Sequence, residues 1–203
     1  MKLYFAPHAC SLAPHIILRE LDLPFALVRV NNQSKATADG RDFRSINPKG
    51  YVAALELDNG EILTEGPAIL QYLADLKPQA GLAPANGSWE RSRLQELLNF
   101  ISTEMHAGSA PLFNAQLPEA AKAIFREKLF KRLDYLEQIL ASSDYLRGSF
   151  SVADAYLFTV LNWLPLFAID IGQWPALAAY VARIAQRPAV RAAIASEAAS
   201  TPV

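Results

Sequence analysis

The stretch VAALELDNGEILTEGPAILQYLADL, residues 52–76, joins a hairpin pattern directly to a helix pattern. Leu55, Leu57 and Ile62 alternate around Asp58-Asn59-Gly60, and these turn residues tolerate the positive φ that a tight hairpin needs. From residue 64 to residue 76 the apolar side chains recur at helical spacing. The stretch therefore predicts two antiparallel strands followed by a helix, whose apolar side carries Ile69, Leu70, Leu73 and Leu76.

The residues before this stretch predict a strand, a helix and a second strand at 2–6, 11–20 and 25–30. Such a unit usually has parallel strands joined by a right-handed crossover. A short helix is expected around residues 39–45. The expected order is βαβ and then αββα, which is an α+β domain with a mixed four-stranded sheet in residues 1–77.

The residues after this stretch change in composition. KPQAGLAPANGS, residues 77–88, is rich in proline, glycine and small polar residues and predicts a linker at 78–87. Every later segment is helical in pattern, so residues 88–203 are expected to form an all-α domain. In its first helix one stripe is apolar, and Asn99, Thr103 and His106 share a polar side. A second helix is expected from Pro118 to Leu140.

Ser151 and Asp154 have the spacing of a capping box at the start of another helix. The box accounts for Asp154 without a catalytic role. The apolar run at 155–171 is shorter than the roughly 20 residues of a membrane span and contains polar breaks, so it predicts a buried core helix. Two further helices are expected to end near Pro188 and near the C-terminus.

Charge and cysteine content exclude several classes of protein. The chain of 203 residues is 52% hydrophobic and has a formal charge of -1, which predicts a folded protein without affinity for nucleic acid or membrane. The N-terminus lacks the pattern of a signal peptide, so a cytoplasmic location is expected. The single cysteine, Cys10, excludes an internal disulfide and a multi-cysteine metal site, and no metal is expected.

Five short motifs together resemble the bacterial beta class of the cytosolic glutathione transferases. They are CSL (10–12), INPKG (46–50), LDNGEILTEGPAILQYLAD (57–75), NFISTEMHAG (99–108) and FSVADAYLFTV (150–160). The resemblance implies a thioredoxin-like first domain that holds glutathione as co-substrate. It also implies a helical domain that shapes a pocket for an electrophile, and a homodimer.

Cys10 and Ser11 lie where a strand ends and a helix begins. Unpaired amides and the dipole at a helix N-terminus favour a thiolate, although a free cysteine is also commonly a buried side chain. The resemblance places Cys10 beside the glutathione sulfur, as a hydrogen-bond donor or as a partner in a reversible mixed disulfide. Ser11 either caps the helix or hydrogen-bonds the same sulfur.

Other positions match the groups that hold the rest of glutathione. Glu65 suits the γ-glutamyl amine and the amide of Gly66 suits the carboxylate, whereas simple helix stabilisation is the alternative. Lys35, and more weakly Lys49, suit the glycyl carboxylate, but Lys49 is also typical of a solvated surface lysine. The backbone of Val52 matches the residue that pairs with the cysteinyl backbone.

In the helical domain, the resemblance places His106, Asn99 and Glu104 at the glutathione site, partly from the partner subunit. His106 would hydrogen-bond or act as an acid or base, although an isolated histidine is also often structural. Phe113, Trp163 and Phe167 are expected in the core, with the wall of a substrate pocket as the alternative.

Three positions depart from the family pattern. Ala53 replaces a proline that follows a cis peptide bond in relatives, so either the bond stays cis or the loop is rebuilt. Ala107 replaces a lysine, and Tyr51 replaces a glutamine. We therefore expect a glutathione transferase acting on small, mostly apolar electrophiles. The alternatives are a glutathione-dependent disulfide reductase or peroxidase using Cys10, and a non-catalytic binding or regulatory protein.

Overall fold

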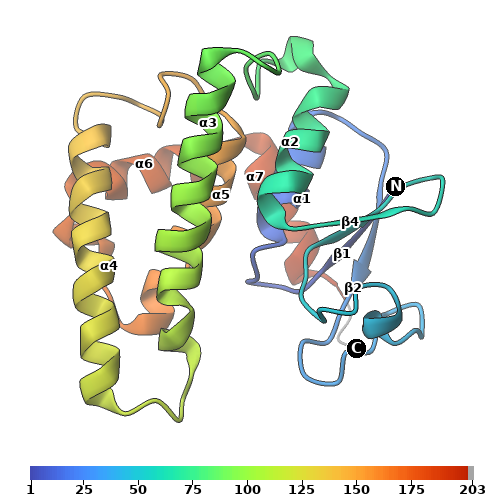
Figure 1. Ribbon diagram of the computed structural model, residues 1–203, viewed down its shortest axis with the longest axis horizontal. Coiled ribbons are helices and arrows are strands. Elements are labelled where there is room, and N and C mark those ends of the chain that lie inside the picture. Colours follow the sequence, from blue (N-terminus) through green and yellow to red (C-terminus); the bar gives the residue numbers. More distant parts are fainter. Residues whose placement is uncertain (201–203) are drawn as a thin grey trace. The chain divides into compact units, whose positions relative to one another are not determined.

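The computed structural model describes residues 1–200, and the chain divides by its contacts into two compact units (Figure 1). The first unit contains Met1–Gly81 together with the residues from Gln186 onward, and the second is Leu82–Ala185. The sequence-based boundaries at 1–77, 78–87 and 88–203 stay a prediction. The contacts differ from them in one respect, because the C-terminal helix packs with the first unit.

The first unit contains the predicted mixed sheet. Its strands β1 (Lys2–Phe5), β2 (Ala26–Arg29), β3 (Ala54–Glu56) and β4 (Ile62–Thr64) lie in the order β2-β1-β3-β4. Strands β1 and β2 are parallel, whereas β3 is antiparallel to both of its neighbours. The hairpin turn between β3 and β4 has Gly60 at φ +86°, as the turn chemistry predicted.

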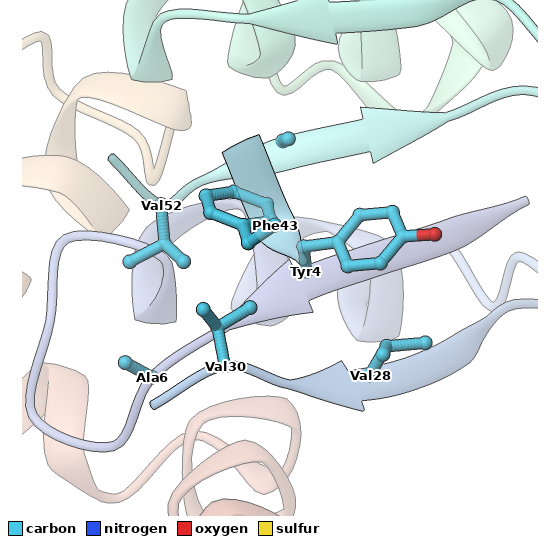
Figure 2. Close-up of a cluster of buried hydrophobic side chains, with 7 residues drawn as sticks. Tyr4, Ala6, Val28, Val30, Phe43 and Val52 are labelled. Carbon is cyan, nitrogen blue, oxygen red and sulfur yellow. The ribbon is translucent and has the colours of Figure 1, made fainter. Parts of the chain in front are cut away.

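The two faces of this sheet bury alternate side chains of the strands. Figure 2 shows one face, where Tyr4 and Val28 pack with Phe43 from a short 3₁₀ helix at Phe43–Ser45. A short helix was expected around residues 39–45, and the structure has one over residues 43–45 only. Phe5 on the other face lies against His15 of α1 (Leu12–Glu20), with ring centroids 6.4 Å apart. Helix α2 (Gly66–Leu76) packs against α1 and β4.

Helix α7 (Pro188–Ala198) packs on α1 through buried polar contacts that the sequence analysis did not single out. The His15 Nδ1 atom lies 2.9 Å from the Glu197 carboxylate, and Arg19 Nε donates to His15 Nε2 at 2.9 Å. Arg187 forms a bidentate ion pair with Glu20 at 2.6 and 2.9 Å. These contacts tie the end of the described chain to the sheet unit.

The second unit is helical. It contains α3 (Trp89–Phe100), α4 (Glu119–Leu140), α5 (Val152–Leu161) and α6 (Pro175–Ala185). All residues of α5 are buried, and the predicted capping box is present at its start. No helix within residues 1–200 is long and apolar enough to cross a membrane.

The apolar run at 155–171 is not the single core helix that its composition predicted. Helix α5 ends at Leu161, and a separate 3₁₀ turn follows at Leu164–Phe167. The Asn162 side chain donates to the Phe158 carbonyl at 2.8 Å, and Pro165 has no amide to continue the helical ladder. The polar and proline positions therefore end the helix earlier than expected.

Candidate functional site

Cys10 lies in the loop between β1 and α1 and is half-buried. Its thiol donates a hydrogen bond to the carbonyl oxygen of Val52, with a sulfur–oxygen distance of 3.1 Å. The structure therefore brings together two predicted site residues that are far apart in the sequence.

Burial raises the pKa of the Cys10 thiol from 9.0 to about 11. Nearby backbone N–H groups of Cys10, Ala53 and Ser11 lower this pKa, whereas the charge of Glu65 raises it. The expectation that the helix N-terminus favours a thiolate is thus wrong, because the desolvation of the buried thiol outweighs the amides. Cys10 is therefore a neutral thiol, and the backbone amides of Cys10, Ser11 and Ala53 lie near its sulfur.

Ser11 is fully buried and its hydroxyl bonds the end of β1. It accepts from the Ala6 amide at 3.2 Å and donates to the Ala6 carbonyl at 3.3 Å. Its backbone is already helical, at φ -63° and ψ -14°, and its side chain makes no capping hydrogen bond. The interpretation of Ser11 as a helix cap is therefore wrong, because a cap needs extended backbone and a hydroxyl aimed at the first turn.

The Val52–Ala53 peptide bond is cis. Of the two alternatives raised by the alanine, the structure has the first. Val52 and Ala53 are both buried, and the carbonyl of Val52 is the acceptor for the Cys10 thiol.

Glu65 precedes α2 with its backbone at φ +71° and ψ 114°. A side chain other than glycine at positive φ costs on the order of 1–3 kcal/mol, and such residues cluster at functional sites. The carbonyl of Glu65 accepts from the amides of Ala68 and Ile69 at 3.0 Å. Gly66, whose amide lies at the open N-terminus of the helix, follows directly.

Lys49 forms an ion pair with Glu65 and donates to the Thr64 hydroxyl at 2.8 Å. The interpretation of Lys49 as a solvated surface lysine is confirmed, since its side chain is exposed, but the lysine also has a specific partner in Glu65. Both side chains remain exposed, so the pair adds little stability, but it holds the Glu65 carboxylate at the start of α2.

Lys35 is half-buried and has φ +65°. Its amide donates to the Asn31 carbonyl at 2.9 Å, and its own carbonyl accepts from the Phe43 amide at 2.8 Å. Its side chain runs past Gly50, because a Cβ added to that glycine would lie 3.9 Å from the Lys35 Cε. The structure therefore places the stem of Lys35 beside Gly50, which precedes Val52 by two residues.

The residues predicted on α3 extend into a π-helical segment, Ile101–Ala107. The wider turn breaks the α-helical spacing by which Asn99, Thr103 and His106 were expected to share one side. Asn99 is exposed, whereas His106 is half-buried with its Nδ1 2.7 Å from the Tyr156 hydroxyl. Glu104 has a different partner, since Arg132 donates to its carboxylate at 2.6 Å.

His106 also belongs to an aromatic cluster. Its ring lies 4.9 Å from that of Trp163, and Phe113 contacts Trp163 and Phe167 at 5.4 and 4.7 Å between ring centroids. Trp163 and Phe167 are buried, which confirms their expected place in the core. Phe113 is 50% exposed, so the expectation that it belongs to the core is wrong.

The sequence did not predict three side-chain contacts of the candidate site residues. These are Lys49 with Glu65, Arg132 with Glu104, and Tyr156 with His106. The pattern held no signal for Tyr156, because α5 is buried on all sides and has no polar stripe. Lys49 lies inside the quoted INPKG motif, and that was the one available signal.

Comparison with known sequence families gives two matches. The glutathione S-transferase N-terminal domain matches residues 9–76, and the glutathione S-transferase C-terminal domain matches residues 100–188. The two families together span most of the chain.

Individual relatives match over nearly the whole chain. Glutathione S-transferase GstA of Escherichia coli O157:H7 is 44% identical, over 97% of this chain and 98% of that protein. The structure of a sphingomonad glutathione S-transferase complexed with glutathione has a TM-score of 0.95 and 48% identity, covering 98% of this chain and 100% of the other. The bacterial beta class glutathione S-transferase of Sphingomonas chungbukensis has a TM-score of 0.94 and 45% identity, covering 97% and 98%. The chain therefore belongs to the glutathione S-transferase family, within its bacterial beta class.

Proposed function

We propose that this protein is a glutathione transferase that joins the glutathione thiol to small, mostly apolar electrophiles. The observation that carries the proposal is the surroundings of Cys10: a neutral thiol with amides of Cys10, Ser11 and Ala53 close to its sulfur. A second sulfur bound here would meet these hydrogen-bond donors and no thiolate charge on Cys10, so the negative charge near it would be that of Glu65. These donors would favour its thiolate form.

In the proposed reaction the proton of the glutathione thiol is lost to solvent, and the sulfur attacks an electrophilic carbon. A carbon–sulfur bond forms while the leaving group departs with its electron pair. Cys10 stays protonated and donates to the glutathione sulfur, which requires its S–H to turn away from the Val52 carbonyl. The protein thus stabilises the nucleophile and holds it near the electrophile.

The rest of glutathione would be held by groups of the first unit. Glu65 would accept from the γ-glutamyl amine, and the amide at Gly66 would bind the adjacent carboxylate at the N-terminus of α2. The Val52 backbone would pair with the cysteinyl residue, and Lys35 would bind the glycyl carboxylate. The backbone of Glu65, at φ +71°, supports its role in binding rather than in helix stability alone.

The roles proposed for the helical unit and for a homodimer rest on the family resemblance. His106, Asn99 and Glu104 are proposed at the glutathione site of a homodimer, with His106 as a hydrogen-bonding or acid–base group. The half-exposed Phe113 supports an apolar surface for the electrophile.

The reductase alternative is less favoured because it needs Cys10 as a thiolate. With a pKa of about 11, only about one part in 10,000 is ionised at neutral pH. The non-catalytic alternative rests on Ala53 and Ala107, and the donors around Cys10 count against it.

Conjugation of glutathione to an activated chloroarene, followed by absorbance, tests the proposal together with binding to immobilised glutathione. Cys10→Ala should retain much of the conjugation, and Glu65→Gln should weaken glutathione binding. Glu61→Gln, an exposed carboxylate in the hairpin turn, is the matched control and should bind normally. Failure to bind glutathione at millimolar concentration would overturn the proposal, and loss of all conjugation in Cys10→Ala would favour the reductase.

A further inference from the structure

The loop that carries Lys35 folds back on itself beside the sheet. Two isolated antiparallel bridges, Val30 with Thr37 and Ala36 with Asp42, close it. The amide of Phe43 reaches across to the Lys35 carbonyl at 2.8 Å. The backbone of Lys35 is thus held by the returning part of the loop, residues 41–43.

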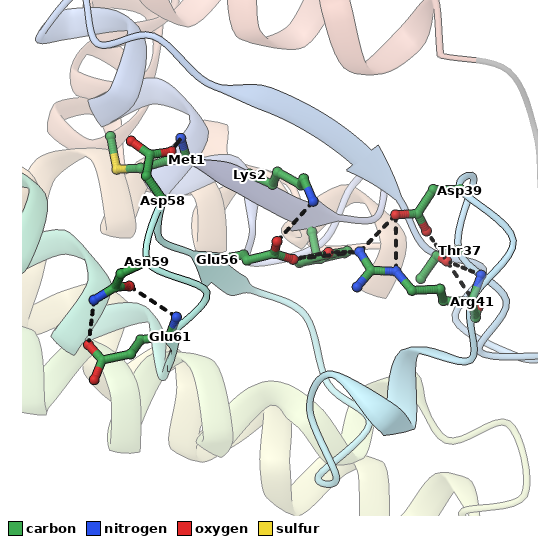
Figure 3. A network of polar contacts seen from close by, with 10 residues as sticks. Met1, Lys2, Thr37, Asp39, Arg41, Glu56, Asp58, Asn59 and Glu61 are labelled. Atoms are coloured by element: carbon green, nitrogen blue, oxygen red, sulfur yellow. Dashed lines mark hydrogen bonds and ion pairs between the residues drawn. The ribbon is translucent and has the colours of Figure 1, made fainter.

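Arg41 fixes this returning part to the sheet (Figure 3). Its Nη2 donates to the hydroxyl of Tyr4 on β1 and lies 3.5 Å from the carboxylate of Glu56 on β3. The Tyr4 hydroxyl in turn donates to Glu56 at 2.5 Å, and Lys2 Nζ donates to the same carboxylate at 2.8 Å. Because Tyr4 is fully buried in the sheet, Arg41 is attached to a fixed point.

Arg41 also closes the loop from within. Its guanidinium donates to Asp39 from Nη2 at 2.8 Å and from Nε at 3.1 Å. Thr37 donates to Asp39 at 2.5 Å, and the hydroxyl of Thr37 accepts from the Arg41 amide at 2.9 Å. We call Arg41, Tyr4, Glu56 and Asp39 the Arg41 cluster.

The Arg41 cluster is connected to Lys35 through backbone bonds alone. Arg41 accepts from the Thr37 amide at 3.0 Å, and two residues later Phe43 donates to Lys35. Lys35 also keeps positive φ, which a loop must enforce for a side chain other than glycine. Releasing Arg41 would therefore loosen the backbone from which the Lys35 ammonium extends.

From this connection we infer that Arg41 is a positioning residue for Lys35, and that it thereby sets the preference of the site for the tripeptide glutathione over γ-glutamylcysteine. The inference rests on the proposed function, in which Lys35 binds the glycyl carboxylate. γ-Glutamylcysteine lacks the glycyl residue, so it cannot benefit from a well-placed Lys35. Arg41 itself is bound to the sheet and need not touch either thiol.

Calorimetric affinities of the full chain for glutathione and for γ-glutamylcysteine test the inference. Removing Lys35 with Lys35→Met should lower the glutathione preference by about tenfold or more, as for a lost charge-assisted hydrogen bond. Arg41→Met should lower the same preference by roughly three- to tenfold and leave γ-glutamylcysteine affinity within about twofold. Adding Arg41→Met to Lys35→Met should change the preference no further, because both act through one ammonium group.

Two further variants distinguish a specific effect of Arg41 from a general loss of structure. Tyr4→Phe keeps the buried ring and removes only the hydroxyl that Arg41 bonds, so it should lower the preference in the same direction. Arg93→Met removes an exposed arginine of α3 whose partner is Glu96, and it should leave the preference unchanged.

The outcomes distinguish failure of the proposed role of Lys35 from failure of the proposed role of Arg41. If Lys35→Met leaves the preference unchanged, the proposed role of Lys35 fails and the inference with it. If Lys35→Met lowers the preference but Arg41→Met does not, only the inference is overturned. It is also overturned if Arg41→Met weakens both thiols equally, or if its effect persists in full without Lys35.

Discussion

Cys10 should be alkylated far more slowly in the folded protein than in the unfolded chain. Burial raises the pKa of its thiol from 9.0 to about 11, and only the thiolate reacts with iodoacetamide. At pH 7 the ionised fraction falls from about one part in 100 to about one part in 10,000. The folded protein should therefore react about 100-fold more slowly, before any steric protection is counted.

The pH dependence separates ionisation from steric protection. Restricted access slows the reaction by the same factor at every pH, whereas a raised pKa shifts the whole profile. Mass spectrometry follows the reaction without ambiguity because the chain has one cysteine. The rate should rise about tenfold per pH unit up to about pH 10, with urea-unfolded protein as the control. A rate that levels off at or below pH 9 would refute the reasoning.

Three further predictions concern stability. Because the folded pKa of Cys10 is raised, the protonated thiol should contribute up to about 3 kcal/mol of stability, present below pH 9 and lost as pH rises toward 11. Urea unfolding across that range would reveal the loss, and an equal loss in Cys10→Ala would contradict the prediction. Asp154→Ala leaves the buried amides of Leu146 and Ser151 without their acceptor and should lower the free energy of unfolding by about 3–5 kcal/mol. The exposed Asp144→Ala should lower it by under about 1 kcal/mol, and equal losses for the two variants in calorimetry would contradict the prediction. Glu197→Ala removes the buried partner of His15 and should lower the free energy of unfolding by about 2 kcal/mol. If the loss is no larger than that of the exposed Glu61→Ala, the contact between His15 and Glu197 does not hold α7 on α1.

The parts of the fold that were predicted correctly depend on short-range chemistry. The hairpin around Gly60 follows from turn residues that accept positive φ, and the capping box at Ser151 follows from two side chains three residues apart. The strand–helix–strand unit likewise follows from periodicity within each segment. Such features need no knowledge of distant residues.

The features that were missed depend on contacts between distant residues. The pKa of Cys10 is set by burial and by the loop at Val52 and Ala53, which no property of residues 10–12 reveals. The packing of α7 on α1 depends on the pair of His15 and Glu197, which are separated by almost the whole chain.

The π-helical segment was missed for a different reason. Its residues, 101–107, have ordinary helical composition, and an assumed α-helical period placed His106 beside Asn99. Only packing reveals that His106 instead bonds Tyr156 and contacts Trp163. The cap interpretation of Ser11 failed because residue type and position do not reveal that its hydroxyl bonds Ala6 rather than the first turn of the helix.

The Cys10→Ala variant offers the most direct test of the central claim, that the donors around this site stabilise the glutathione thiolate. The variant contains no protein thiol, so the ultraviolet absorbance of thiolate in its complex reports glutathione alone. The amides of Ser11 and Ala53 remain in place. Bound glutathione is therefore predicted to ionise at a lower pH than free glutathione. A titration in which bound and free glutathione ionise at the same pH would contradict the claim.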